Sequence, residues 1–324
     1  MAADSRPFAG RAAVVGVGAI GSALAAELAR CEAAKELVLA DRNAARAAAK
    51  AADLSHCAPL GGVRSVSGCG LDDLSGAQVV VIAAGALPPE TGTRMDALAA
   101  NLELYRRLVP QLARANPDAI FLVITNPVDL MTSAALALSG FPPERVLGTG
   151  TLLDGLRLRA ILARELGLDS RAIEAEVAGE HGDSMVPLWS RARAAGEPLA
   201  AYAASAGIDI GPGFKERVMR EVRRAGWEIR AAKEHSVYAI SRCAALIVER
   251  LMGLGSGELT LSREAGSAFG QSGLCMSLPS LVGPAGAFPA PNVALSDEEA
   301  EGLRLSAESL RPYLAQLGAL LGGA

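Results

Sequence analysis

The chain has 324 residues, of which 51% are hydrophobic and 20% are charged, and its formal net charge is −4. A chain of this length buries a substantial core and is typical of two domains. With 31 basic and 35 acidic residues, the composition provides no basic stripe for nucleic acid and no polybasic segment for a membrane surface. The five cysteines include no C-x-x-C pair, which argues against a disulfide framework and against a metal site of the zinc type.

A secretion signal requires a basic start followed by an apolar stretch, and the N-terminus lacks this arrangement. No apolar run approaches the roughly 20 residues of a membrane-spanning helix. The sequence therefore predicts a cytoplasmic protein that does not enter a membrane.

A glycine-rich turn lies near the start of the chain. An apolar, β-prone run at residues 12–17 leads into Gly16-Val17-Gly18-Ala19-Ile20-Gly21, and an alanine-rich helix is predicted over 22–30. Gly16 permits a tight turn, Gly18 lets the backbone approach a pyrophosphate, and Gly21 lets the helix pack closely, while the helix N-terminus supplies positive potential. We expect this turn, including Ala19 and Ile20, to bind a dinucleotide.

The next predicted strand, at residues 36–40, ends in Asp41, which lies 20 residues after the last glycine of the turn. A carboxylate at this position accepts hydrogen bonds from both hydroxyls of the adenosine ribose and repels a 2′-phosphate. The pattern favours NAD over NADP as cofactor, although the neighbouring Arg42 leaves some use of NADP open.

Strands and helices continue to alternate, with a helix predicted at 43–54, a strand at 78–84, a helix at 93–115 and a strand at 119–125. The continuous apolar run at 79–82 suits a strand buried on both faces, as in a parallel sheet. This predicts an α/β fold with a Rossmann-type doubly wound parallel sheet over residues 1–148. Amphipathic stretches at 213–232 and 236–252, strand-like pieces between 257 and 282, and a final helix at 297–320 then predict a second, α+β catalytic domain over 149–324.

Several polar residues fall at predicted strand ends, where ligands bind in such folds. Asn126 follows the strand at 119–125, and Arg94 lies in a long loop between a strand and a helix. Asp154 and Arg157 are three residues apart and share a face if they are helical. His181, one of three histidines, is a scarce candidate for acid–base chemistry near neutral pH.

These pieces together resemble the NAD-dependent L-lactate/malate dehydrogenase family, from about residue 12 to the final helix. The resemblance is carried by the glycine turn with Asp41, by Ala84-Gly85 with Arg94, by Asn126-Pro127, by the run 148–154 with Arg157, and by Gly179-Glu180-His181-Gly182-Asp183. It implies NAD as cofactor, with Ala84, Gly85 and Asn126 among its contacts. It also implies a homo-oligomer, with a tetramer as our first expectation and a dimer as the other.

The resemblance also implies a role for each polar residue. His181 would protonate the substrate carbonyl as hydride arrives from NADH, and Asp154 would orient the imidazole and stabilise its cation. Arg157 would bind the substrate carboxylate. Arg94, on a closing loop, would polarise the carbonyl, and Asn126 would hydrogen-bond near the nicotinamide ribose and the substrate.

The substrate is indicated by the position six residues before Arg94, where lactate-type relatives carry glutamine and malate-type relatives carry arginine. Here it is Pro88, which has neither a donor nor a charge and so favours a small substrate, L-lactate or pyruvate. Ser236 stands where lactate-type relatives carry a threonine beside the substrate. His235, just before it, is interpreted as a packing or solvent-facing residue, and His56 is given no chemical role.

Three alternatives stay open. Malate dehydrogenase is the first, because the run 184–187 resembles malate-type relatives. A catalytically silent NAD-binding protein is the second, but such a protein would tend to lose the catalytic group, whereas His181, Asp154 and Arg157 all remain. An NAD-dependent glycosidase would need metal ligands, and the run around His181 argues against it.

Overall fold

The structure is a computed structural model that describes residues 10–86, 97–233, 236–266 and 273–322. Its centre is a parallel sheet whose strands, in spatial order, are β3 (Ser65–Cys69), β2 (Glu36–Ala40), β1 (Arg11–Val15), β4 (Val79–Ile82), β5 (Ile120–Val123) and β6 (Val146–Gly148). Neighbouring strands pair in parallel throughout this series. The order 3-2-1-4-5-6 is that of a doubly wound Rossmann sheet, so the predicted fold class is confirmed.

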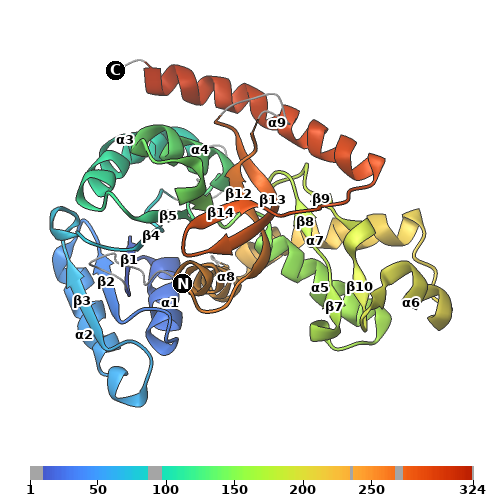
Figure 1. Cartoon of the computed structure of the whole chain (residues 1–324), viewed down its shortest axis with the longest axis horizontal. Helices are drawn as coiled ribbons and strands as arrows, with labels where there is room; N and C mark the ends of the chain where they lie inside the picture. Colours follow the sequence, from blue (N-terminus) through green and yellow to red (C-terminus); the bar gives the residue numbers. More distant parts are fainter. Residues whose placement is uncertain (1–9, 87–96, 234–235, 267–272, 323–324) are drawn as a thin grey trace.

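Helices cover both faces of this sheet (Figure 1). One face packs against α1 (Ala19–Arg30), α2 (Ala44–Ser55) and α8 (Tyr238–Leu251), and the other against α3 (Leu98–Ala115), α4 (Val128–Ser139) and α9 (Asp297–Gly322). Alternate residues of β4 serve the two cores: Val79 and Val81 join the α1 side, and Val80 and Ile82 the α3 side. Burial on both faces explains the continuous apolar run seen in the sequence.

A third hydrophobic core, separate from the two on either face of the sheet, lies in the second half of the chain. It contains α5 (Leu152–Leu166), α6 (Leu199–Ala206) and α7 (Pro212–Lys233). Two small antiparallel sheets flank these helices, one made of β11 (Glu197–Pro198), β10 (Arg193–Ala194) and β7 (Ile173–Glu174), the other of β8 (Val177–Ala178) and β9 (Val186–Pro187). The turn between β8 and β9 carries the segment around His181.

The strands of the second half also extend the first sheet, which the sequence did not indicate. β12 (Gly257–Glu264) lies antiparallel beside β6, with Ser262 opposite Gly148. Beyond it lie β13 (Cys275–Gly283) and β14 (Gly286–Pro289), so the described residues form one nine-stranded sheet. An uncovered β6 would expose unpaired backbone groups, and the hairpins of the second half satisfy them. The division at residues 148 and 149 remains a prediction from the sequence.

The element bounds differ modestly from those predicted. The first helix begins at Ala19, directly after Gly18, rather than at residue 22. The helix predicted at 93–115 is described from Leu98 onward, and residues 93–96 lie outside the described residues. Among the described helices, none is both long enough and apolar enough to cross a membrane.

Close packing of α2 on β3 generates a stability prediction. A Cβ at Gly68 would lie 2.4 Å from the backbone carbon and oxygen of Ala47 and 2.5 Å from the nitrogen of Ala48. Because backbone atoms cannot move aside as a flexible side chain can, we expect Gly68→Ala to lower the free energy of unfolding by about 1–3 kcal/mol. Urea unfolding followed by circular dichroism measures this.

Gly257→Ala is the matched control, because a Cβ there would meet no atom within 4 Å. We expect its unfolding free energy to stay within about 0.5 kcal/mol of the wild type, as for other uncrowded surface substitutions. Equal losses in the two variants would contradict the packing argument.

Candidate active site

A buried carboxylate holds the imidazole of His181. His181 lies in the turn between β8 and β9, and Asp154 lies in the first turn of α5. Nδ1 of His181 is 2.6 Å from Oδ2 of Asp154, whose side chain is only 1% exposed. An ionised carboxylate only accepts hydrogen bonds, so Nδ1 carries the proton in this pair. The other ring nitrogen, Nε2, is then the one suited to exchange a proton with a ligand.

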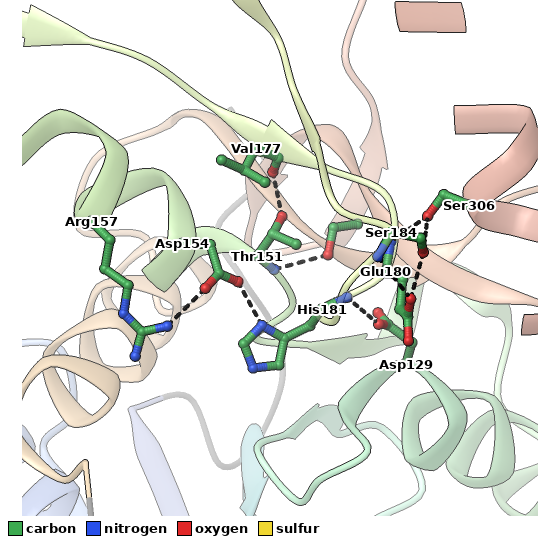
Figure 2. A network of polar contacts seen from close by, with 10 residues as sticks. Asp129, Thr151, Asp154, Arg157, Val177, Glu180, His181, Ser184 and Ser306 are labelled. Atoms are coloured by element: carbon green, nitrogen blue, oxygen red, sulfur yellow. Dashed lines mark hydrogen bonds and ion pairs between the residues drawn. The ribbon is translucent and has the colours of Figure 1, made fainter. Parts of the chain in front are cut away.

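The same carboxylate contacts Arg157, which lies one helical turn further along α5. Nη1 of Arg157 donates to Oδ1 of Asp154 over 2.8 Å, and the arginine side chain is 12% exposed. Figure 2 shows Asp154 between Arg157 and His181, with one oxygen directed at each. The spacing of three residues thus brings the two groups to one helix face, as predicted.

A second buried carboxylate, Asp129, holds the backbone of His181, and the sequence reasoning did not find it. The N–H of His181 donates to Oδ2 of Asp129 over 2.7 Å, and Asp129 is 3% exposed in the first turn of α4. Burial raises the pKa of Asp129 to about 6, and the hydrogen bond from His181 opposes this shift. The available signal was an acidic residue at the start of an otherwise apolar helix, three residues after Asn126.

Helix α9 fixes the other side of the His181 turn. The N–H of Glu180 donates to the hydroxyl of Ser306 over 2.8 Å, and the hydroxyl of Ser184 donates to the carboxylate of Glu180. Gly179 has a φ of +83°, and a Cβ there would lie 2.7 Å from the Ser306 hydroxyl oxygen. The segment therefore needs glycine at 179, and it is anchored both to α4 and to α9 (Figure 2).

The glycine turn has the geometry of a dinucleotide site. Gly16 has a φ of +92°, and a Cβ there would lie 2.6 Å from the nitrogen of Ala84, whereas a Cβ at Gly21 would lie 1.9 Å from the oxygen of Gly16. Only glycine fits at either position. A Cβ at Gly18 would meet nothing within 4 Å, so the protein leaves space at the start of α1, where an anionic group is stabilised. These residues fit a pyrophosphate.

Asp41 lies beside this turn at the end of β2. It is 3% exposed and accepts hydrogen bonds from the N–H groups of Val17 (2.9 Å) and Asn43 (3.0 Å) and from the guanidinium of Arg46 (2.8 and 2.9 Å). Burial by itself would raise its pKa, but the hydrogen bonds from Asn43, Arg46 and Val17 outweigh burial, and the pKa is lowered. Asp41 is therefore an ionised carboxylate near the adenosine end of the expected site.

The ends of β4 and β5 are tied together by two residues that the sequence reasoning missed. The hydroxyl of Thr125 donates to the carbonyl of Ala84 over 2.8 Å. The buried amide of Asn101 accepts from the N–H of Ala86 (2.6 Å) and donates to the carbonyl of Asn126 (2.8 Å). A Cβ at Gly85 would lie 2.5 Å from the Thr125 methyl group. The side chain of Asn126 remains exposed at this edge of the sheet.

The other predicted site residues are distributed as follows. Ala19 and Ile20 form the first turn of α1, where the carbonyl of Ile20 accepts a hydrogen bond from Ser241 of α8 over 3.3 Å. Ser236 is half-buried just ahead of α8. Pro88, Arg94 and His235 lie outside the described residues.

A dinucleotide turn and a carboxylate-bound imidazole, connected through the ends of neighbouring parallel strands, are typical of dinucleotide-dependent oxidoreductases. This chain belongs to the lactate/malate dehydrogenase family. The family's NAD-binding domain matches residues 10–148, and its alpha/beta C-terminal domain matches residues 151–319. The protein is thus an NAD-dependent oxidoreductase of hydroxy acids.

Individual relatives agree with this assignment. The chain is 37% identical over 305 residues to an L-lactate dehydrogenase of Thermus aquaticus, covering 94% of this chain and 98% of the relative. It is 38% identical over 311 residues to an L-lactate dehydrogenase of Salinibacter ruber, covering 94% and 96%. Among solved structures, it resembles MGS-M5, a lactate dehydrogenase from a Medee basin deep-sea metagenome library, with a TM-score of 0.87, 30% identity, and coverage of 95% and 98%.

The pKa of Asp129 generates a prediction about the pH dependence of stability. A folded-state pKa of about 6, against an ordinary value of 3.8, means that the folded protein retains a proton that the unfolded chain loses. The contribution of the protonated Asp129 carboxyl to the free energy of unfolding is fully present below about pH 4, and it is lost as the pH rises through about 6. The free energy of unfolding of the wild type, relative to Asp129→Asn, should therefore fall by roughly 3 kcal/mol between these limits.

Urea unfolding of both proteins at closely spaced pH values measures this difference. Asp118→Asn removes an exposed carboxyl group and is the control, for which we expect a much flatter difference. A difference between wild type and Asp129→Asn that does not change with pH would contradict the role of the buried carboxyl.

Proposed function

We propose that this protein is an NAD-dependent L-lactate dehydrogenase that interconverts pyruvate and L-lactate. The observation that carries the proposal is the arrangement of His181 and Arg157 on the two oxygens of one buried carboxylate, Asp154. It provides a proton donor and a cation for a substrate carboxylate within one small group. The names of the relatives support lactate as the substrate, and Pro88 in the sequence supports a substrate without a second carboxylate.

In the proposed reaction, Nε2 of His181 delivers a proton to the carbonyl oxygen of pyruvate and takes it back from lactate. Bound NADH supplies the hydride for the carbonyl carbon. Asp154 keeps the imidazole in one tautomer and stabilises the imidazolium that forms when lactate is oxidised. Asp129, through the backbone of His181, keeps the ring where this proton transfer takes place.

Arg157 binds the substrate carboxylate with guanidinium N–H groups other than the one directed at Asp154. A guanidinium presents several donors in a plane, so it can hold two carboxylates at once. We further propose that Arg94 polarises the substrate carbonyl, that Asn126 and Ser236 line the substrate site, and that Pro88 lies beside the substrate methyl group.

The proposed cofactor site begins at the turn from Gly16 to Gly21, where α1 starts. The N–H groups of Gly18, Ala19 and Ile20 would bind the pyrophosphate. The carboxylate of Asp41 would accept the ribose hydroxyls, and Ala84, Gly85 and Asn126 would contact the nicotinamide half. We propose that the protein works in the cytoplasm as a homo-oligomer, most simply a tetramer.

The role of His181 can be tested with a matched pair of variants. Gln cannot donate a proton as an imidazolium does, so His181→Gln should lower kcat for pyruvate reduction by about a hundred- to ten-thousand-fold. NADH binding, measured by fluorescence titration, should be unaffected. His56→Gln, at an exposed histidine after α2, is the control and should retain full activity. Unchanged turnover in His181→Gln would rule out the mechanism.

The choice of substrate can be tested by comparing pyruvate, oxaloacetate, 2-oxobutyrate and 2-oxoisocaproate as acceptors of hydride from NADH. We expect kcat/KM to be highest for pyruvate, because no cation is expected at position 88 to pair with the second carboxylate of oxaloacetate. A Pro88→Arg variant should shift the ratio toward oxaloacetate at least tenfold. If the wild type reduces oxaloacetate far more efficiently than pyruvate, the protein is a malate dehydrogenase. Turnover of none of the four would indicate a silent NAD-binding protein.

A further inference from the structure

The carboxylate of Asp41 is fully occupied by donors from the protein itself. Each oxygen has two contacts: Oδ2 accepts from the N–H of Val17 and from Arg46, and Oδ1 accepts from the N–H of Asn43 and from Arg46, all within 2.8–3.0 Å. An ionised carboxylate has about four acceptor positions. A ribose hydroxyl can therefore donate to Asp41 only if one of these donors leaves.

The donors differ in their ability to leave. The N–H groups of Val17 and Asn43 belong to the backbone of the glycine turn and of the segment leading into α2, and the side chain of Asn43 also caps α2 by accepting from the N–H of Arg46 over 2.9 Å. The guanidinium of Arg46 is at the end of a flexible side chain that is 47% exposed. Arg46 is thus the donor that a ribose would displace.

A displaced guanidinium would stay close to Asp41, because the backbone of Arg46 is held at the first turn of α2. Lys50, one turn further along α2, donates to the hydroxyl of Ser22 on α1 over 2.8 Å, and that hydroxyl donates to the carbonyl of Val17 over 3.0 Å. Lys50 therefore adds positive charge between α2 and the glycine turn. Asp41 lies in surroundings where its negative charge is largely compensated.

We propose that Arg46 determines how strictly this protein selects NAD over NADP. With NAD, the ribose hydroxyls take the place of the guanidinium on Asp41. With NADP, the displaced guanidinium binds the 2′-phosphate, so the protein accepts NADPH as a second, weaker cofactor. This inference rests on the proposed role of Asp41 as the acceptor for the adenosine ribose.

The charges explain why one residue has opposite consequences for the two cofactors. A bare carboxylate beside the 2′ position repels a phosphate group and so rejects NADP. A guanidinium forms charge-assisted, two-pronged bonds with phosphate oxygens and offsets that repulsion. Toward NAD the same guanidinium competes with the ribose for Asp41, so its removal costs little or nothing in NADH binding.

Titration calorimetry of the full chain with NADH and with NADPH tests the proposal without relying on turnover. We expect the wild type to bind both, with NADH tighter. Arg46→Ala should weaken NADPH binding at least tenfold and change the Kd for NADH less than threefold. Arg46→Lys keeps the charge but not the fork of donors, so its NADPH affinity should fall between those of the wild type and Arg46→Ala.

Two further arginine variants are controls. Arg42→Ala removes the exposed cation next to Asp41, and Arg30→Ala removes one at the far end of α1, where it pairs with Glu27. In both variants, we expect the ratio of the Kd for NADPH to the Kd for NADH to stay within twofold of the wild-type ratio. An unchanged Kd for NADPH in Arg46→Ala, or a loss of NADPH binding in Arg42→Ala instead, would overturn the proposal, as would a wild type that binds NADH but not NADPH.

Asp41→Ala separates this inference from the proposal on which it rests. We expect it to bind NADH more weakly and to discriminate less against NADPH. If Asp41→Ala binds NADH as tightly as the wild type, Asp41 is not the ribose acceptor, and the inference falls with it. If Asp41→Ala weakens NADH binding but Arg46→Ala leaves NADPH binding intact, only the role of Arg46 is wrong.

Discussion

Burying an ionisable carboxyl group costs several kcal/mol unless hydrogen bonds or counter-charges compensate it, and this structure buries three such groups at the proposed active and cofactor sites. Asp41, Asp129 and Asp154 are each at most 3% exposed. Asp154 is compensated by an imidazole and a guanidinium, and Asp41 by two backbone N–H groups and a guanidinium. Asp129 is compensated only in part, by the backbone N–H of His181, and its pKa is therefore raised. Since each carboxyl is stable only with its partners in place, the partners are positioned by the same interactions that stabilise the fold.

The parallel sheet explains why these groups meet. Asp41 follows β2, Asp129 lies at the start of the helix after β5, and Asp154 at the start of the helix after β6. Parallel strands all end at one edge, so residues far apart in sequence are brought to that edge without any specific contact between their strands. Two of the three also lie in the first turn of a helix, where the helix dipole stabilises a negative charge. The glycine turn after β1 adds the proposed site for the anionic part of the cofactor.

The sequence was sufficient to predict the parts of this arrangement that have local signals. The glycine turn, the buried strand at β4, and the shared helix face of Asp154 and Arg157 all follow from spacing and apolar pattern. β3 was missed because its sequence, Ser-Val-Ser-Gly-Cys, is not apolar, as expected of a half-exposed edge strand. The pairing of β12 with β6 was missed because it joins residues more than a hundred positions apart, and no local pattern encodes such a partner. Asp129 and Asn101 were missed for the same reason, since their importance lies in contacts with His181, Ala86 and Asn126.

The extension of the sheet across the two halves of the chain has a mechanical consequence. In a protein made of two separately folded lobes, the cofactor and the proton donor can move apart as the lobes rotate about a hinge, and binding energy is spent on bringing them together. Here β6 and β12 are neighbours in one sheet, and Ser241 of α8 is bonded to Ile20 of α1. The relative position of the glycine turn and His181 is therefore established when the chain folds. Such a framework favours catalysis by preorganisation, because the proposed cofactor site and the proposed proton donor keep a fixed position relative to each other.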